Sequence, residues 1–166
     1  LALISKKTGI PILHDAAHSF GSKYKGVPIG NQHTYTIFSF DPVKTITCID
    51  GGAIILKSAD AAKKLQSKRL IGMGQSANQM YKNSRAWTYD IEELGFRYHM
   101  ANLHAAIGVC QIQKINEIRK TRQEVCKIYH STLSPLDWLH APQGDFENIN
   151  PFLYYIRVIK GSRSKF

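Results

Sequence analysis

Cysteine is scarce in this sequence of 166 residues, which holds three of them. Cys48, Cys110 and Cys126 are odd in number and widely spaced, a pattern that excludes a paired disulfide framework and a Cys-x-x-Cys metal site. A continuous run of about 18 apolar residues is also missing, so we expect no helix that spans a membrane. Both absences favour a soluble cytoplasmic protein with reduced thiols.

Acidic residues are few, because 12 Asp and Glu stand against 22 Lys and Arg and give a formal net charge of +10. Such an excess can attract nucleic acid, an anionic surface or a phosphorylated small ligand. The basic residues are spread over two candidate helices, and no nucleic-acid-binding motif accompanies them. We therefore interpret them as solvated helix faces and expect no nucleic-acid partner. Nucleic-acid binding with a strong salt dependence is the alternative.

Internal repeats and low-complexity tracts are absent too. The start, LALISKKTGIPILHD, opens without methionine and puts lysines after a very short apolar piece, which fits neither a signal peptide nor a natural start. We therefore expect a fragment of a longer protein. Its length and its hydrophobic content of 43% still allow one domain with a real core.

What is present is an alternation of strand and helix patterns. Short apolar or β-branched runs predict strands at 10–16, 34–40, 51–57 and 151–160. Ser58 and Asn102 are suitable N-caps for helices at 58–70 and 102–134. Segments without a clear period predict loops at 19–32 and 73–100. The alternation predicts an α/β fold in which helices cover a sheet.

Lys44 stands in an unusual setting for a lysine, between the apolar run TIFSF and a Gly-Gly pair. The ammonium form of lysine is a poor nucleophile, whereas an apolar setting frees the amine to condense with an aldehyde. This setting suggests a Schiff-base lysine. The simpler alternative is a turn lysine whose ammonium group reaches water.

Asp15, Ser39 and Thr45 indicate which aldehyde this would be. Asp15 ends the first predicted strand, where a buried carboxylate needs a positive partner such as the protonated ring nitrogen of pyridoxal phosphate (PLP). Ser39 and Thr45 bracket the turn that holds Lys44 and can donate hydroxyl hydrogen bonds to a phosphate, with the amides of the Gly-Gly pair nearby. The alternatives are a cap or an ion pair for Asp15 and a turn-forming role for Ser39.

Four segments in order carry a resemblance to a known family: HDAAHSFGSKYKG, FSFDPVK, DGGAII and ELGFRYHMANLHAAIGVCQIQKI. Together they resemble the nucleotide-sugar aminotransferases of the DegT type, within the fold type I PLP enzymes. The resemblance implies that residues 1–140 are the second half of a PLP-binding large domain with a mainly parallel sheet. Residues 141–166 would be a linker and the truncated start of the small C-terminal domain.

The resemblance implies a role for each matched residue. Asp15 would pair with the pyridinium nitrogen, His18 would lie near the cofactor ring and its 3-hydroxyl, and Ser39 would bind the phosphate. Lys44 would form the Schiff base and later carry the proton. Arg97 stands where the family more often has asparagine, on a loop that reaches the phosphate site of the neighbouring subunit, and would bind phosphate there. A surface or structural role for Arg97 is the alternative.

The implied reaction is PLP-dependent transamination of a keto sugar nucleotide to an amino sugar nucleotide, with glutamate as the amino donor, for polysaccharide or glycan biosynthesis. Relatives that dehydrate instead carry histidine at the lysine position, so Lys44 favours transamination. The family also implies a homodimer with active sites at the interface. Because the upstream half of the family's site is not in this sequence, we expect the 166 residues alone to be inactive.

Two other interpretations remain open at this point. A truncated or degenerate paralogue would keep the fold as a non-catalytic binding or regulatory module. His14 and His18, four positions apart, could ligate zinc, although a third ligand at a convincing spacing is missing, so we expect no metal.

Overall fold

The computed structural model describes residues 2–31, 35–74 and 89–161. The chain divides into two units, one formed by Leu1–Ile55 and Leu103–Phe166 and a smaller one formed by Leu56–Asn102. The larger unit contains Asp15, His18, Ser39 and Lys44, four of the five predicted site residues.

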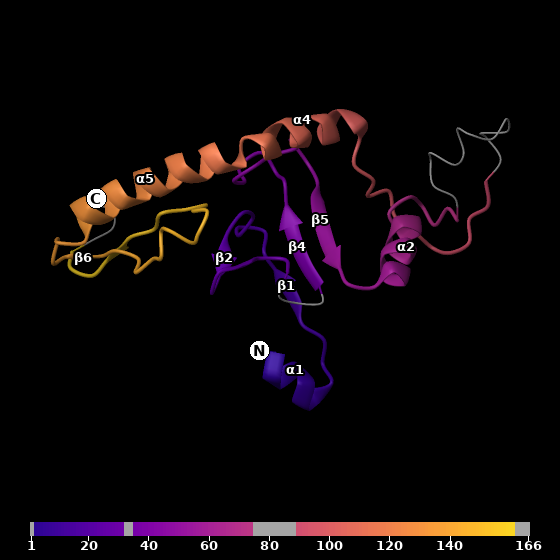
Figure 1. Ribbon diagram of the computed structural model, residues 1–166, viewed down its shortest axis with the longest axis horizontal. Coiled ribbons are helices and arrows are strands. Elements are labelled where there is room, and N and C mark those ends of the chain that lie inside the picture. Colours follow the sequence, from indigo (N-terminus) through magenta and orange to yellow (C-terminus); the bar gives the residue numbers. More distant parts are fainter. Residues whose placement is uncertain (1, 32–34, 75–88, 162–166) are drawn as a thin grey trace. The chain divides into compact units, whose positions relative to one another are not determined.

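A three-stranded sheet forms the centre of the larger unit. It consists of β1 (Leu13–Asp15), β4 (Tyr35–Ser39) and β5 (Gly52–Leu56), in that order across the sheet. Strands β1 and β4 are parallel, with Asp15 opposite Ile37, whereas the arrows of β4 and β5 point in opposite directions in Figure 1. The predicted α/β class is confirmed, and the sheet combines a parallel pair with a third strand of reversed direction.

The two faces of β4 differ in burial. Thr36 and Phe38 are 0% and 5% exposed, whereas the alternate residues, Ile37 among them, are partly exposed. Side chains alternate between the faces of a strand, so one face of β4 belongs to the core and the other is open. The ring of Phe20 packs edge-on against Phe38 and Phe40 on the core side, with centroids 5.1 and 5.5 Å apart.

Two helices replace the single long helix predicted at 102–134. They are α4 (Asn102–Gln113) and α5 (Ile115–Leu133), separated at Lys114, whose backbone angles are φ −96° and ψ 4°. The amphipathic spacing continues across Lys114, which is why the sequence pattern alone does not reveal the break. Helix α4 lies close to the turn after β4, because a Cβ at Gly108 would meet the sulfur of Cys48. None of the helices in the described ranges is both long enough and apolar enough to cross a membrane.

The segment that follows α5 folds back along this helix (Figure 1). Its short strands β6 (Leu139–His140) and β7 (Arg157–Val158) pair antiparallel, across the domain boundary expected at residue 141. The strand predicted at 151–160 is therefore limited to β7. The residues before β7 use their backbone groups for contacts with α5 and with the loop after β1.

Besides β6, a helix and a hairpin in the described part of the larger unit are not anticipated by the sequence patterns. The helix is α1 (Ala2–Thr8). The hairpin consists of β2 (Lys23–Tyr24) and β3 (Val27–Pro28) and lies inside the loop predicted at 19–32. Lys25 and Gly26 at its turn both have positive φ, 51° and 77°, as a tight two-residue hairpin requires.

The smaller unit begins with the helix α2 (Ala59–Lys68), which confirms the prediction at 58–70. The hydroxyl oxygen of Ser58 accepts a hydrogen bond of 3.2 Å from the backbone N–H of Ala61, so Ser58 is the N-cap. Of the loop predicted at 73–100, residues 75–88 lie outside the described part. The described rest is irregular apart from two isolated bridges, one between Met73 and Ile91 and one between Leu70 and Arg97.

Candidate functional site

Asp15 and Ser39 end two adjacent parallel strands, β1 and β4, at the same edge of the sheet. Because Asp15 pairs with Ile37, and Ser39 follows Ile37 by two residues, both side chains point to the open face of the sheet. From the strand spacing and the rise per residue, their Cα atoms are about 8 Å apart. Binding sites of α/β folds commonly lie outside the carboxyl ends of such strands.

The carboxylate of Asp15 is exposed, not buried as the sequence argument assumed. One of its oxygens accepts a hydrogen bond of 3.1 Å from the backbone N–H of Ala17, which closes the turn after β1. None of the ion pairs found among the described residues involves Asp15. The side chain thus keeps acceptor capacity for a cationic ligand group at the sheet edge.

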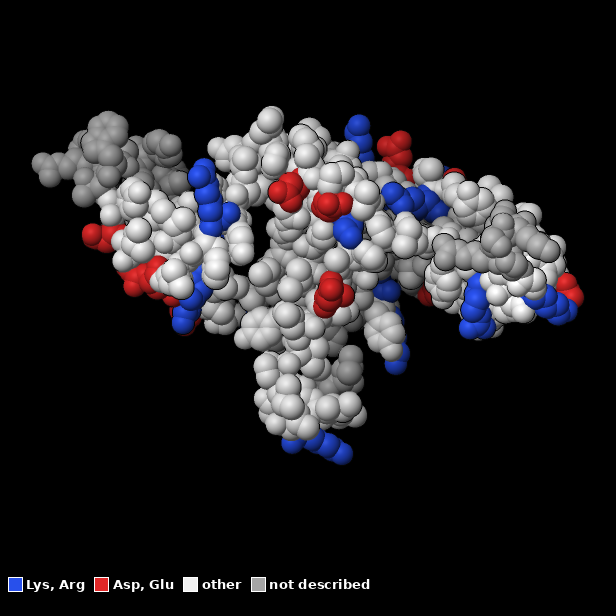
Figure 2. Space-filling model, turned by 180° about the vertical axis from the view of Figure 1, so that it is seen from behind, with Lys and Arg blue, Asp and Glu red and all other residues white. Residues whose placement is uncertain are grey.

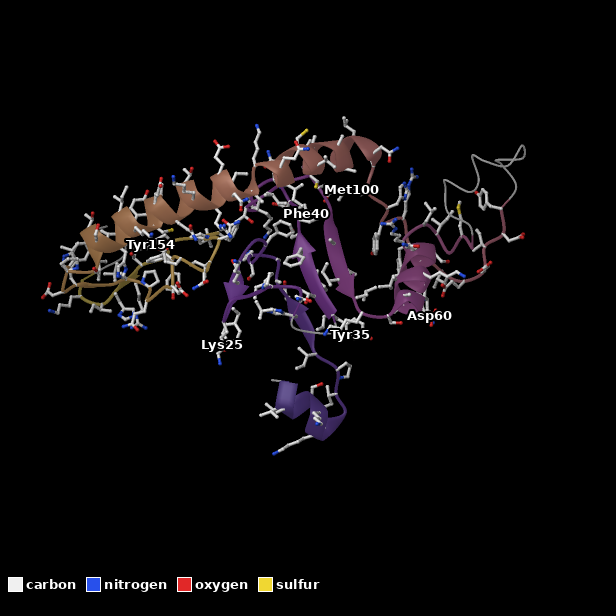
Figure 3. The ribbon with its side chains drawn as sticks, viewed as in Figure 1. Lys25, Tyr35, Phe40, Asp60, Met100 and Tyr154 are labelled. Atoms are coloured by element: carbon white, nitrogen blue, oxygen red, sulfur yellow. The ribbon has the colours of Figure 1, made fainter. Side chains whose placement is uncertain are left out.

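Lys44 lies in a turn that is held by hydrogen bonds between backbone groups of residues 40–51. The amide of Phe40 donates to the carbonyl of Gly51, and the amide of Cys48 donates to the carbonyl of Phe40, both at 2.9 Å. Figure 3 shows Phe40 at the end of β4, where this turn begins. The backbone N–H of Lys44 donates to Asp41 at 3.0 Å, and Lys44 itself is half-buried. The expected water-poor setting is therefore present in part.

The hydroxyl of Ser39, one of the groups predicted to bind phosphate, keeps a free donor. Its hydroxyl oxygen accepts a weak hydrogen bond of 3.4 Å from the Asp41 amide, which leaves its O–H available to donate. Thr45 is 5% exposed, so its hydroxyl is directed into the protein. The amide of Gly51 donates to the carboxylate of Asp50 at 2.7 Å and is therefore occupied.

His18 and Lys44 meet at a residue that the sequence analysis did not single out, Phe152. The imidazole of His18 stacks on the Phe152 ring with centroids 4.1 Å apart, and Lys44 Nζ lies 4.9 Å from the same ring centroid. The ammonium nitrogen and the imidazole centroid are thus at most about 9 Å apart, the sum of these two distances. The turn after β1 and the turn after β4 therefore both contact the ring of Phe152.

Arg97, the fifth predicted residue, belongs to the smaller unit. There it is exposed and forms an isolated bridge with Leu70. The structure thus brings four of the five predicted residues into one unit and places the fifth in the other.

The charges and potential metal ligands of the described surface are dispersed. On the face seen in Figure 2, Lys and Arg residues occur singly or in small groups, separated by uncharged and acidic ones. Within residues 2–31, 35–74 and 89–161, no three His, Cys, Asp or Glu side chains gather as a metal site would require.

The four residues supply a matched set of chemical groups for an aromatic aldehyde that carries a phosphate. Lys44 offers a primary amine, Asp15 an acceptor for a ring cation, Ser39 a hydroxyl donor, and His18 an aromatic side chain beside them. Asp15 and Ser39 lie on the same face of β1 and β4, so the acceptor for a ring cation and the hydroxyl donor point to the same side of the sheet.

Comparison with known proteins points to the same chemistry. The sequence model of the DegT/DnrJ/EryC1/StrS aminotransferase family matches residues 1–165. The chain is 33% identical over 168 residues to the uncharacterized protein MJ1066 of Methanocaldococcus jannaschii. The matched region covers 98% of this chain and 44% of that protein.

Two solved structures share the fold. One is the putative sugar aminotransferase Spr1654 from Streptococcus pneumoniae in its PMP form, with a TM-score of 0.82 and 27% identity over 98% of this chain and 42% of that one. The other is AtS13 from Actinomadura melliaura, with a TM-score of 0.78 and 27% identity over 95% of this chain and 42% of that one. The chain thus spans less than half the length of each of these relatives.

Proposed function

The chain belongs to the DegT/DnrJ/EryC1/StrS aminotransferase family, and from this membership we propose that it is part of a PLP-dependent enzyme that aminates a keto sugar nucleotide. The observation that carries the proposal is the clustering of Asp15, His18, Ser39 and Lys44 around one edge of the sheet. Their groups match what a PLP enzyme requires of its protein.

In this proposal each residue acts on a different part of the cofactor. Asp15 pairs with the protonated ring nitrogen and keeps the proton there, while the hydroxyl of Ser39 donates a hydrogen bond to the phosphate. His18 lies against the ring near its 3-hydroxyl group. The exposure of Asp15 is consistent with a ligand that covers it when bound.

The amine of Lys44 provides the nucleophile and the proton carrier. When bound, PLP supplies the electron sink that makes the proton beside the substrate's amine easier to remove. Lys44 would move that proton from the substrate carbon to the cofactor carbon on the other side of the amine nitrogen, and its half-buried amine is the group that would do so. The hydrogen-bonded turn from Phe40 to Gly51 fixes the backbone from which this side chain reaches.

Glutamate is the proposed amino donor, and polysaccharide or glycan biosynthesis is the proposed purpose of the product. We propose that residues 1–140 form the second half of the large domain and that 141–166 begin the small domain. Arg97 is proposed to bind phosphate across a homodimer. The three unpaired cysteines agree with a reducing, cytoplasmic setting.

The experiment uses the protein encoded by the full open reading frame that contains these residues. Added PLP should give an absorbance band near the visible edge, and reduction with borohydride should leave the cofactor mass on the Lys44 peptide. Lys44→Ala should abolish both signals. Lys25→Ala is the matched control, because Lys25 is an exposed lysine of the same unit that also lies over an aromatic ring, 5.5 Å from the Tyr24 centroid.

Amination of keto sugar nucleotides with glutamate is then measured for both variants. A Lys44→Ala protein that keeps wild-type turnover would refute the catalytic role. PLP binding through Lys44 without turnover on any keto sugar nucleotide would favour the non-catalytic module instead.

A further inference from the structure

We propose that Phe152 is a positioning residue that holds the amine of Lys44 whenever this amine is not bonded to the cofactor. The inference rests on the proposed function, in which the amine of Lys44 is the reacting group. The contact that motivates it is the approach of Lys44 Nζ to within 4.9 Å of the Phe152 ring centroid. An ammonium group over an aromatic face is attracted by the negative charge of that face.

The backbone that carries the Phe152 ring is held by α5. One guanidinium nitrogen of Arg122 donates to the carbonyls of Pro151 and Phe152, at 3.2 and 3.4 Å. The side-chain amide of Gln123 donates to the carbonyls of Glu147 and Ile149, at 3.1 and 2.8 Å. Four carbonyls of the segment 147–152 are thus bound by two neighbouring helix side chains.

The loop after β1 holds the same segment from a second direction. Asn150 is 1% exposed, and its backbone N–H donates to the hydroxyl oxygen of Ser22 at 2.8 Å. Its side-chain amide donates to the carbonyl of Phe20 at 2.9 Å. Because the segment is tied at both sides, the backbone of Phe152, two residues after Asn150, has little freedom to move with Lys44. Lys44 must instead come to the ring.

The neighbours of Phe152 distinguish it from an ordinary core residue. Its ring contacts a histidine and a lysine, both of them predicted site residues, whereas the core ring of Phe20 packs edge-on against Phe38 and Phe40. Phe152 is also only half-buried. A ring in this place can hold the long lysine side chain near the cofactor and exclude water from one side of the amine.

The test measures how fast the amine of Lys44 is acetylated in the full-length protein after removal of PLP, with acetic anhydride and peptide mass spectrometry. The exposed Lys57 is the internal reference. An amine held as ammonium on the ring reacts slowly. Phe152→Leu should therefore raise the relative rate by about two- to fivefold, the change that corresponds to one exposed cation–π contact. Phe152→Tyr keeps a ring and should restore the wild-type rate.

Tyr155→Leu is the matched control, because Tyr155 is a 64% exposed aromatic residue three positions along the same segment. In Tyr155→Leu, Lys44 should be acetylated at the wild-type rate. An unchanged rate in a folded Phe152→Leu protein overturns the proposal. Should that variant fail to fold, Arg122→Gln removes the bonds that fix the backbone of Phe152 and should raise the rate in the same direction, and no increase there overturns the proposal equally.

In the PLP-loaded enzyme, Phe152→Leu should lower kcat, because the amine of Lys44 is then held less well in place. Acetylation without PLP tests only the contact between the ring and the amine. A failure there is thus distinguishable from a failure of the proposed function, which the borohydride trapping at Lys44 reports separately.

Discussion

Replacing Asn150 with alanine tests whether the segment before β7 is held in place by one buried amide. The variant loses the hydrogen bond of 2.9 Å from the Asn150 side chain to the Phe20 carbonyl, in a site that is 1% exposed. A buried acceptor left without its partner costs about 1–3 kcal/mol. The oxygen of the same side chain, Oδ1, is buried and has no hydrogen-bond partner among the described residues. Removing this unpaired oxygen is favourable and offsets part of the cost of the small cavity that the alanine leaves.

We therefore expect Asn150→Ala to lower the free energy of unfolding by about 1–3 kcal/mol, which is about a five- to 150-fold change in the folding equilibrium. Urea denaturation followed by circular dichroism measures it, and the m value should stay unchanged because the native fold is retained. The matched control is Asn116→Ala on the exposed side of α5, where the amide oxygen accepts only from Arg119 at 3.3 Å.

That control should change stability by less than about 0.5 kcal/mol. Equal stability of Asn150→Ala and Asn116→Ala would refute the reasoning, because the buried bond to Phe20 would then contribute nothing. A loss in Asn150→Ala should also loosen the neighbouring Phe152 ring and raise the acetylation rate of Lys44.

Three further predictions concern the fold. Gly52→Ala should lower the free energy of unfolding by about 1–3 kcal/mol, since a Cβ there would lie 2.6 Å from the Phe38 carbonyl oxygen; thermal unfolding checks this, and an unchanged Tm would contradict it. Ser58→Ala should lower the free energy of unfolding by about 1 kcal/mol, because the hydrogen bond from the Ala61 amide is lost, and urea denaturation measures this. Ser134→Ala is the control, because Ser134 follows α5 and is not an N-cap. Burial raises the pKa of the Cys48 and Cys126 thiols above their ordinary value of 9.0, with Arg122 lowering that of Cys126 in part. The unfolded chain therefore loses the two thiol protons at a lower pH than the folded chain does. The free energy of unfolding should fall as the pH rises above about 9, and the two thiols should not change it at lower pH. Cys48→Ala with Cys126→Ala should flatten that decline, whereas replacement of the exposed Cys110 should not.

The strands β4 and β5 and the helix α2 are predictable from the sequence because each has a strong local signal. Ser58 at a helix start and β-branched residues in β4 act within a few positions of themselves. The two-residue strands β2, β3, β6 and β7 have too few residues to show any period, so their pairing depends on turns and tertiary contacts.

The candidate site shows the same limit. Asp15, Ser39 and Lys44 are recognisable because they stand at strand ends and in a turn, where a polar residue after an apolar run is conspicuous. Phe152 gave no such signal, because a phenylalanine in an apolar stretch resembles any other core residue. Its contact with Lys44 depends on the way α5 returns the chain to the sheet, which a local pattern does not encode.

The distance along the chain between Lys44 and Phe152 has a consequence for synthesis on the ribosome. The turn that bears the amine is closed by bonds within residues 40–51, whereas its aromatic cover is translated 108 positions later, the difference between 152 and 44. At about 5–20 residues per second, this interval lasts roughly 5–20 s. During that time the nascent chain presents an uncovered lysine, and the arrival of the last segment closes over it.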